Sequence, residues 1–284
     1  VYKRYLEKKR ANQVSEEKNE QITFQNKVIE QKSHDILDSI MYARRIQRAI
    51  LPPDDYIKNY LDQYFIVYLP KDIVAGDFYW LESKNDLILF AAADCTGHGV
   101  PGAMVSVICN NGLNRSVREF GITDPSKILE KTRDIVIEGF EKSKEDVKDG
   151  MDISLCAYNP ITKRLDWSGA NNPLWIVRNG SNEVEILKPD KQPIGKYVSS
   201  ASFNQQTTSL GTGDMIYMFT DGYADQFGGP KNKKYKSLRF KEFISSNASK
   251  SMAIQRDELV RNFNEWKADN EQIDDVCIIG FRVS

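Results

Sequence analysis

The chain has 284 residues, 40% of them hydrophobic and 28% charged, so it can bury one large core or two small ones. Its net charge of -1 and pI of about 6.3 give no electrostatic basis for binding nucleic acid or an anionic membrane. The four cysteines lack metal-binding or redox spacing, which indicates reduced thiols in a cytoplasmic protein: Cys95, Cys109, Cys156 and Cys277.

Residues 1–53 are predicted to form a long helix that ends at Pro52 and Pro53. An apolar residue recurs every seven positions, as at the d positions of a coiled coil: Ile22, Ile29, Ile36, Ala43 and Ile50. In this register Gln47 lies at an a position. We expect a homodimer through this helix. The alternative is a lone amphipathic helix packed on the following domain. The basic start of the chain is compatible with an upstream sensor or membrane segment in a longer protein.

Residues 54–284 are predicted to form one domain of short strands and helices. Strands are expected at 64–69, 73–81 and 87–94, then helices at 103–120 and 126–144. A strand at 153–158 starts a meander to about residue 187, with turns at 159–162 and Asn179-Gly180. A core strand at 215–220, helices at 240–246 and 254–267, and a last strand at 276–283 complete the order. This order predicts an α+β fold with packed sheets and outer helices.

Four aspartates lie at the ends of apolar strands. Asp94 follows the apolar run 87–93, Asp221 follows 215–220, and Asp77 and Asp274 accompany two further strands. Taken singly, each acid has another interpretation, such as a turn, a bulge or a solvated loop. Together, clustered carboxylates repel one another and favour a hard divalent cation, Mn²⁺ or Mg²⁺. Two such ions support hydrolysis of a phosphate ester without a protein nucleophile.

Four segments in this order resemble a known family: AGDFYW at 75–80, ADCTGHG at 93–99, FTDG at 219–222 and DDV at 274–276. They resemble the SpoIIE/RsbU-type branch of the metal-dependent PP2C (PPM) serine/threonine phosphatases, over residues 62–284. The resemblance implies an αββα sandwich of two antiparallel sheets flanked by helices. It also implies a site for two Mn²⁺ or Mg²⁺ ions at one end of the sandwich.

The resemblance implies a role for each acid. Asp94 would bridge both metal ions, Asp77 would hold one directly or through water, and the Cys95 carbonyl would add a ligand. Asp221 and Asp274 would complete the other ion. Asp94 and Asp77 are therefore the expected catalytic residues.

Three further side chains are assigned lesser or alternative roles. Asp275 is expected to support the ligands rather than bind metal. His98 is either a general acid for the leaving alkoxide or a structural residue of the Gly-rich turn. A Cys95 thiol beside the metals would make the protein sensitive to oxidants.

The expected function is hydrolysis of phosphoserine or phosphothreonine on a protein, which in this branch is commonly an anti-sigma-factor antagonist of the STAS type. The N-terminal helix would regulate the enzyme by changing how residues 36–51 pack on the domain. The alternative is a catalytically silent dimeric scaffold with a phosphatase fold. A nuclease is disfavoured because the chain has no basic groove signature.

Overall fold

The computed structural model describes residues 2–141, 149–198 and 200–284. The chain divides into two compact units, Val1–Arg45 and Ile46–Ser284. Helix α1 (Tyr2–Ile50) supplies the first unit, and its last turn belongs to the second. Gln47 and Leu51, both before the expected domain boundary at residues 53 and 54, are buried in the second unit, and that boundary stays a prediction.

Helix α1 contains no glycine or proline, and it ends directly before Leu51 and Pro52. The side chains of Ile22, Ile29 and Ile36 are between 53% and 63% exposed. Gln47 was placed in the same coiled-coil seam, but its side chain is buried in the second unit instead. Among the helices of the described residues, none is long and apolar enough to cross a membrane.

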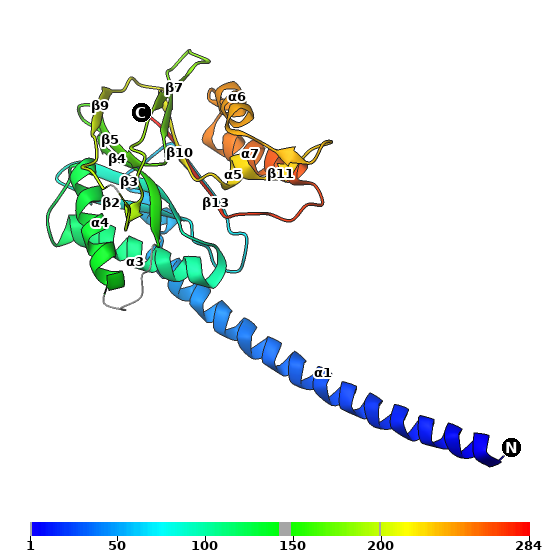
Figure 1. The fold of residues 1–284 in the computed structure, drawn as a ribbon. Helices are drawn as coiled ribbons and strands as arrows, with labels where there is room; N and C mark the ends of the chain where they lie inside the picture. Colours follow the sequence, from blue (N-terminus) through cyan, green and yellow to red (C-terminus); the bar gives the residue numbers. More distant parts are fainter. Residues whose placement is uncertain (1, 142–148, 199) are drawn as a thin grey trace. The chain divides into compact units, whose positions relative to one another are not determined.

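Two antiparallel sheets form the centre of the second unit (Figure 1). The first has the order β1-β13-β10-β6-β7: β1 (Tyr64–Leu69), β13 (Val276–Arg282), β10 (Met215–Phe219), β6 (Leu174–Val177) and β7 (Val184–Leu187). The second has the order β2-β3-β4-β5-β9: β2 (Phe78–Lys84), β3 (Leu87–Cys95), β4 (Gly150–Asn159), β5 (Arg164–Ala170) and β9 (Gln206–Ser209). Strand β8 (Ile194–Gly195) pairs with β4, and β11 (Phe227–Gly228) pairs with β12 (Lys233–Lys234).

Helices cover the outer face of each sheet, as Figure 1 shows. Helices α3 (Gly99–Arg118) and α4 (Pro125–Glu141) share a hydrophobic core with β2, β3 and β4. Helices α6 (Ser237–Asn247) and α7 (Met252–Lys267) share another with β1, β10 and β13. Helices α2 (Asp54–Lys58) and α5 (Gly222–Asp225) are short. The expected αββα sandwich is confirmed.

A third core fills the space between the two sheets. Along β3, Leu89 and Ala91 pack toward the helices, whereas Phe90 and Ala92 pack toward the other sheet. This alternation follows from the two-residue repeat of a strand. It determines which acids face the layer between the sheets.

The largest difference from the expected elements precedes β2. A strand was expected from residue 73, but β2 begins at Phe78. The backbone of Ala75 and Gly76 bonds to the side chains of Gln47 and Asp275 instead of a neighbouring strand. The helix expected at 126–144 ends at Glu141, and residues 142–144 lie outside the described residues.

Candidate functional site

The predicted acids gather where four central strands begin or end. Asp94 lies near the end of β3, and Asp77 directly precedes β2, whose Phe78 pairs with Ala93. Asp221 follows the end of β10, and Asp274 precedes β13. Strands β2 and β3 are antiparallel, as are β10 and β13, so the start of one strand lies beside the end of its neighbour. The acids of each pair therefore lie at the same end of their sheet.

The two-residue repeat turns several of these side chains toward the layer between the sheets. Phe90 and Ala92 face that layer, so Asp94 in the same strand does too. By the same repeat, Cys277 and Ile279 place Asp275 there, and Met218 places Thr220 there. The acids therefore lie at one open end of the inter-sheet core.

A hydrogen bond joins the two sheets at this end. The Thr220 hydroxyl donates to Asp77 Oδ2 at 2.6 Å, and Thr220 Oγ1 accepts from the Cys277 amide at 2.9 Å. Asp77 is only 2% exposed. This bond fixes a carboxylate next to β2 against the ends of β10 and β13.

Asp275 anchors the loop that leads to Asp77. Its Oδ1 accepts from the Lys71 amide and its Oδ2 from the Gly76 amide, both at 2.7 Å. The neighbouring Asp274 Oδ1 accepts from the Asp275 amide at 2.9 Å. Both Asp275 oxygens are thus engaged by protein, as suits a supporting residue.

Glycines let the acid-bearing loops approach one another closely. A Cβ atom on Gly76 would lie 2.3 Å from the Gly97 carbonyl oxygen, and one on Gly102 would lie 2.1 Å from the same atom. A Cβ atom on Gly222 would lie 2.0 Å from the Asp275 carbonyl oxygen. Only glycine permits these contacts, which hold the Asp77 loop on the Asp94 turn and the Asp221 turn on residues 274 and 275.

Burial and mutual repulsion raise the pKa values of the acids. Burial raises the pKa of Asp77 well above its usual range, and the charge of Asp94 adds to the effect. Burial also raises the pKa of Asp94, with further contributions from Asp221 and Asp274. Burial, followed by Asp225 and Asp274, raises the pKa of Asp221 to about 6. Among the described residues, none donates a hydrogen bond to the Asp94 carboxylate.

One acid of this group was not predicted. Asp152 in β4 pairs directly with Asp94 in β3, and its Oδ1 accepts from Asn171 Nδ2 at 2.8 Å. Burial raises the pKa of Asp152. The signal was present in the sequence as an acid next to Gly150 and Met151 before an apolar run, but its partner depends on strand register.

Cys95 and His98 differ in their surroundings. The Cys95 side chain is 4% exposed and packs in the core beneath α3, and burial raises its pKa, so the expected sensitivity of this thiol to oxidants is not supported. His98 Nδ1 lies 2.8 Å from Asp72 Oδ2, and its Nε2 lies 2.8 Å from Lys71 Nζ. Since a lysine ammonium only donates, His98 Nε2 accepts and Nδ1 carries the proton toward Asp72.

The donor set suits a hydrated hard cation. Among residues 2–141, 149–198 and 200–284, no three His, Cys, Asp or Glu side chains converge closely enough to hold a metal ion by themselves. Mg²⁺ commonly keeps several waters and takes only one or two carboxylates directly. Buried carboxylates that repel one another, with oxygens not engaged by protein donors, fit such an ion.

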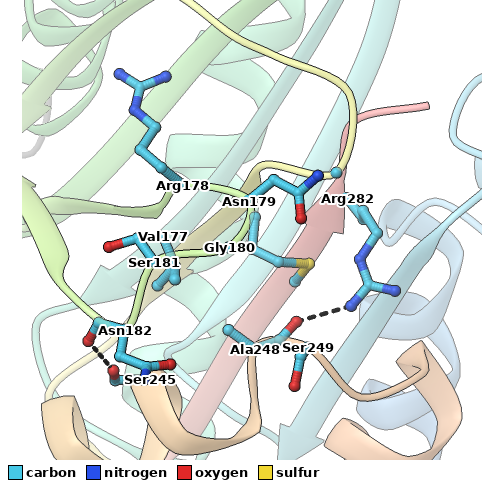
Figure 2. Close-up of a pocket in the computed structure, with 12 residues that line it drawn as sticks. Val177, Arg178, Asn179, Gly180, Ser181, Asn182, Ser245, Ala248, Ser249 and Arg282 are labelled. Atoms are coloured by element: carbon cyan, nitrogen blue, oxygen red, sulfur yellow. Dashed lines mark hydrogen bonds between the residues drawn. The ribbon is translucent and has the colours of Figure 1, made fainter.

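A pocket of about 300 Å³ lies at the other end of the strands (Figure 2). It is lined by Val177 at the end of β6, Met215 at the start of β10 and Arg282 at the end of β13. Arg282 Nη2 donates to the Ala248 carbonyl at 2.7 Å, as Figure 2 shows. It also donates to the Lys250 carbonyl at 2.6 Å. Its charge is already engaged by the carbonyls after α6, and the carboxylate end is the stronger candidate.

Comparison with known families agrees with the fold. The profile of the family described as Stage II sporulation protein E (SpoIIE) matches residues 84–284. No curated protein matches the chain significantly.

Among solved structures, the SiaA-PP2C domain of Pseudomonas aeruginosa is 30% identical, with a TM-score of 0.81 over 89% of this chain and 98% of that one. The PP2C phosphatase domain of SpoIIE from Bacillus subtilis, with a regulatory fragment, is 18% identical, with a TM-score of 0.61 over 78% and 62%. The RsbU and RsbW domains of a Mycobacterium tuberculosis protein are 21% identical, with a TM-score of 0.59 over 77% and 59%. The last two show the shared fold.

Proposed function

The chain belongs to the SpoIIE family of PP2C phosphatase domains, and from this premise we propose that it hydrolyses phosphoserine or phosphothreonine on a protein with two Mn²⁺ or Mg²⁺ ions. The observation that carries the proposal is the group of acids at one end of the inter-sheet core. Asp77 and Asp94 come from one sheet, and Asp221 and Asp274 from the other. Burial and repulsion between carboxylates raise the pKa of Asp94. Bound cations would reduce this repulsion by neutralising the negative charges.

The proposed role of each residue follows from the hydrogen bonds that its side-chain oxygens already make. Asp94, Asp77, Asp221, Asp274 and the Cys95 carbonyl would hold the ions. When bound, two divalent ions supply a reactive water and neutralise the phosphoryl oxygens. Thr220 orients the Asp77 carboxylate, and Asp275 orients the loop before it. Asp94 and Asp77 are the catalytic residues of the proposal.

Two neighbours of the same fold support the choice of cofactor and reaction. One is RsbX in complex with magnesium, with a TM-score of 0.54 and 15% identity. Another is a serine/threonine phosphatase of S. agalactiae, with a TM-score of 0.56 and 15% identity. At this identity they share the fold, and the acids of this chain supply the chemical argument.

Substrate and regulation complete the proposal. A cytoplasmic phosphoprotein of the STAS type is the proposed substrate, and the N-terminal helix is the proposed regulatory element. Gln47 in the last turn of α1 is buried, and this turn belongs to the same compact unit as the acids.

Hydrolysis of p-nitrophenyl phosphate and of a phosphoserine peptide, with and without Mn²⁺, tests the proposal. We expect Mn²⁺-dependent turnover in the wild-type chain. We expect Asp94→Asn to lower kcat by about 100-fold or more, the scale on which removing one electrostatic group slows other enzymes. Asp257→Asn, an exposed substitution of the same chemistry on α7, should have no effect.

Equal rates in wild type and Asp94→Asn would contradict the assigned site. Absence of turnover in the wild-type chain with either metal, on either substrate, would instead favour the silent dimeric scaffold.

A further inference from the structure

The last turn of α1 places one polar side chain inside the phosphatase domain. Gln47 lies three residues before the end of the helix and is only 5% exposed. It belongs to the same compact unit as the acids. A buried glutamine needs partners for two N–H donors and a carbonyl, so its contacts show what it does.

Gln47 pairs with the backbone of a single residue, Ala75. Its Nε2 donates to the Ala75 carbonyl at 2.5 Å, and its Oε1 accepts from the Ala75 amide at 3.1 Å. The second Nε2 proton faces Ser106 Oγ in α3 at 3.2 Å, and that hydroxyl donates onward to the Ala103 carbonyl at 2.8 Å. The Ala75 amide can only donate, so the orientation of the Gln47 amide is determined.

Ala75 is the first of three consecutive residues that are each held by a different part of the fold. Gln47 of α1 holds Ala75, Asp275 holds the Gly76 amide, and Thr220 holds the Asp77 carboxylate. These three residues precede β2 and have no strand partner. Their conformation therefore depends on these side chains.

We propose that Gln47 is a positioning residue that sets the Asp77 carboxylate through Ala75, and thereby couples the end of α1 to catalysis. This inference rests on the proposed phosphatase function and names the contact through which the helix would regulate it. Gln47 does not touch the reacting atoms. It fixes the backbone two residues before the catalytic acid.

The geometry of a helix makes the contact between Gln47 and Ala75 sensitive to rotation of α1. Successive helical residues are about 100° apart around the axis, so a rotation of the last turn by one position would present Ile46 or Arg48 in place of Gln47. Isoleucine has no polar side-chain atom and arginine no acceptor, so neither can pair with both the amide and the carbonyl of Ala75. The contact is either complete or lost.

Gln47→Met removes the polar atoms at similar length and tests the proposal in the full chain. The matched control is Gln25→Met, an exposed position of the same helix. Ser106→Ala is the second comparison, because it removes the third contact and leaves the Ala75 pairing in place. Each variant is assayed for kcat on a phosphoserine peptide, for the Mn²⁺ concentration at half-maximal rate, and for amide exchange of residues 72–78 by mass spectrometry.

We expect Gln47→Met to raise the half-maximal Mn²⁺ concentration about tenfold and to increase amide exchange at 72–78, with the melting temperature within a few degrees of wild type. Gln25→Met and Ser106→Ala should leave the Mn²⁺ dependence near that of wild type. Faster exchange at 72–78 with unchanged kcat and Mn²⁺ dependence would overturn the inference, because the loop would then move without affecting the acid.

Calorimetric titration of Mn²⁺ separates this inference from the proposed function. If the wild-type chain shows no turnover, the phosphatase proposal fails. Weaker Mn²⁺ binding in Gln47→Met than in Gln25→Met would still support the positioning role. Equal Mn²⁺ affinity in the two variants would overturn it.

Discussion

The acids at the site differ in the hydrogen bonds that their carboxylate oxygens accept, and this difference indicates which acids bind metal and which support them. Both oxygens of Asp275 accept backbone amides, one oxygen of Asp77 accepts a hydroxyl, and Asp94 has no hydrogen-bond donor among the described residues. A carboxylate whose two oxygens both accept protein donors has fewer lone pairs left for a metal ion than one with an unengaged oxygen. Asp275 is therefore suited to support the loop before Asp77, and Asp94 is suited to bind metal.

The raised pKa of Asp221 predicts a pH-dependent stability in metal-free protein. The pKa is about 6 in the folded chain against an ordinary 3.8, so ionisation of Asp221 favours unfolding. This penalty is absent below pH 3.8, grows as the pH rises and is complete above about 6. In EDTA, Asp221→Asn should therefore gain free energy of unfolding relative to wild type across that range and hold the gain at higher pH.

Urea denaturation at a series of pH values measures this difference. Asp257→Asn, on the exposed face of α7, should show no trend against wild type. Added Mn²⁺ should remove the advantage of Asp221→Asn by stabilising only the wild-type chain. A difference between Asp221→Asn and wild type that does not vary with pH would contradict the assigned pKa.

At the scale of elements, the start of α3 connects the loops that carry Asp77 and Asp94. Gly102 in its first turn lies against the Gly97 carbonyl and the Gly76 Cα atom. The helix, the Asp94 turn and the Asp77 loop meet there without room for a side chain. A small displacement of α3 would thus separate the two acids that belong to one sheet.

Gly102→Ala is expected to disrupt this junction. Its Cβ atom would lie 2.1 Å from the Gly97 carbonyl, and overpacking of this kind costs about 1–3 kcal/mol. We expect a lower free energy of unfolding and a loss of phosphatase rate beyond the loss of folded protein. Gly139→Ala in α4 is the matched control: its Cβ atom would lie 3.8 Å from Ile108, and alanine should stabilise that helix by about 0.5–1 kcal/mol.

Thermal melts and rates normalised to folded protein distinguish the two variants. Equal behaviour of Gly102→Ala and Gly139→Ala would show that α3 can move without disturbing the acids.

At the scale of the whole molecule, the exposed apolar residues of α1 predict a dimer. Ile22, Ile29 and Ile36 are spaced by seven and are more than half exposed, which suits the seam of a coiled coil. We expect the wild-type chain to have twice the monomer mass in light scattering, and Ile29→Asp to shift it toward the monomer. Lys27→Asp, an exposed position outside the seam, should remain dimeric. A monomeric wild-type chain at the highest concentration measured would refute the dimer.

Much of this architecture was predictable from residue patterns. The apolar runs at 87–93 and 215–220 predicted buried strands, and the family resemblance of the motifs around Asp94 and Asp221 implied the αββα arrangement. Local patterns are sufficient there, because the apolar side chains determine the strands and the acids directly follow them.

The remaining features depend on contacts between distant residues. The heptad pattern placed Gln47 in a coiled-coil seam, but its amide pairs with Ala75, which no seven-residue repeat reveals. The strand expected from residue 73 starts later because Asp275 holds Gly76. Asp152 joins the acids only through the register of β3 and β4.

The position of β13 has a consequence for synthesis of the chain. This strand is translated after every other strand described here, yet it lies between β1 and β10 in its sheet. Domains fold as units as the chain leaves the ribosome. β1 and β10 have no common neighbour until residues 276–282 have emerged, and Asp274 emerges just before them. A chain interrupted before residue 274 therefore carries Asp77, Asp94 and Asp221 but lacks Asp274 and the strand between β1 and β10, so we expect phosphatase activity to begin only after β13 has been synthesised.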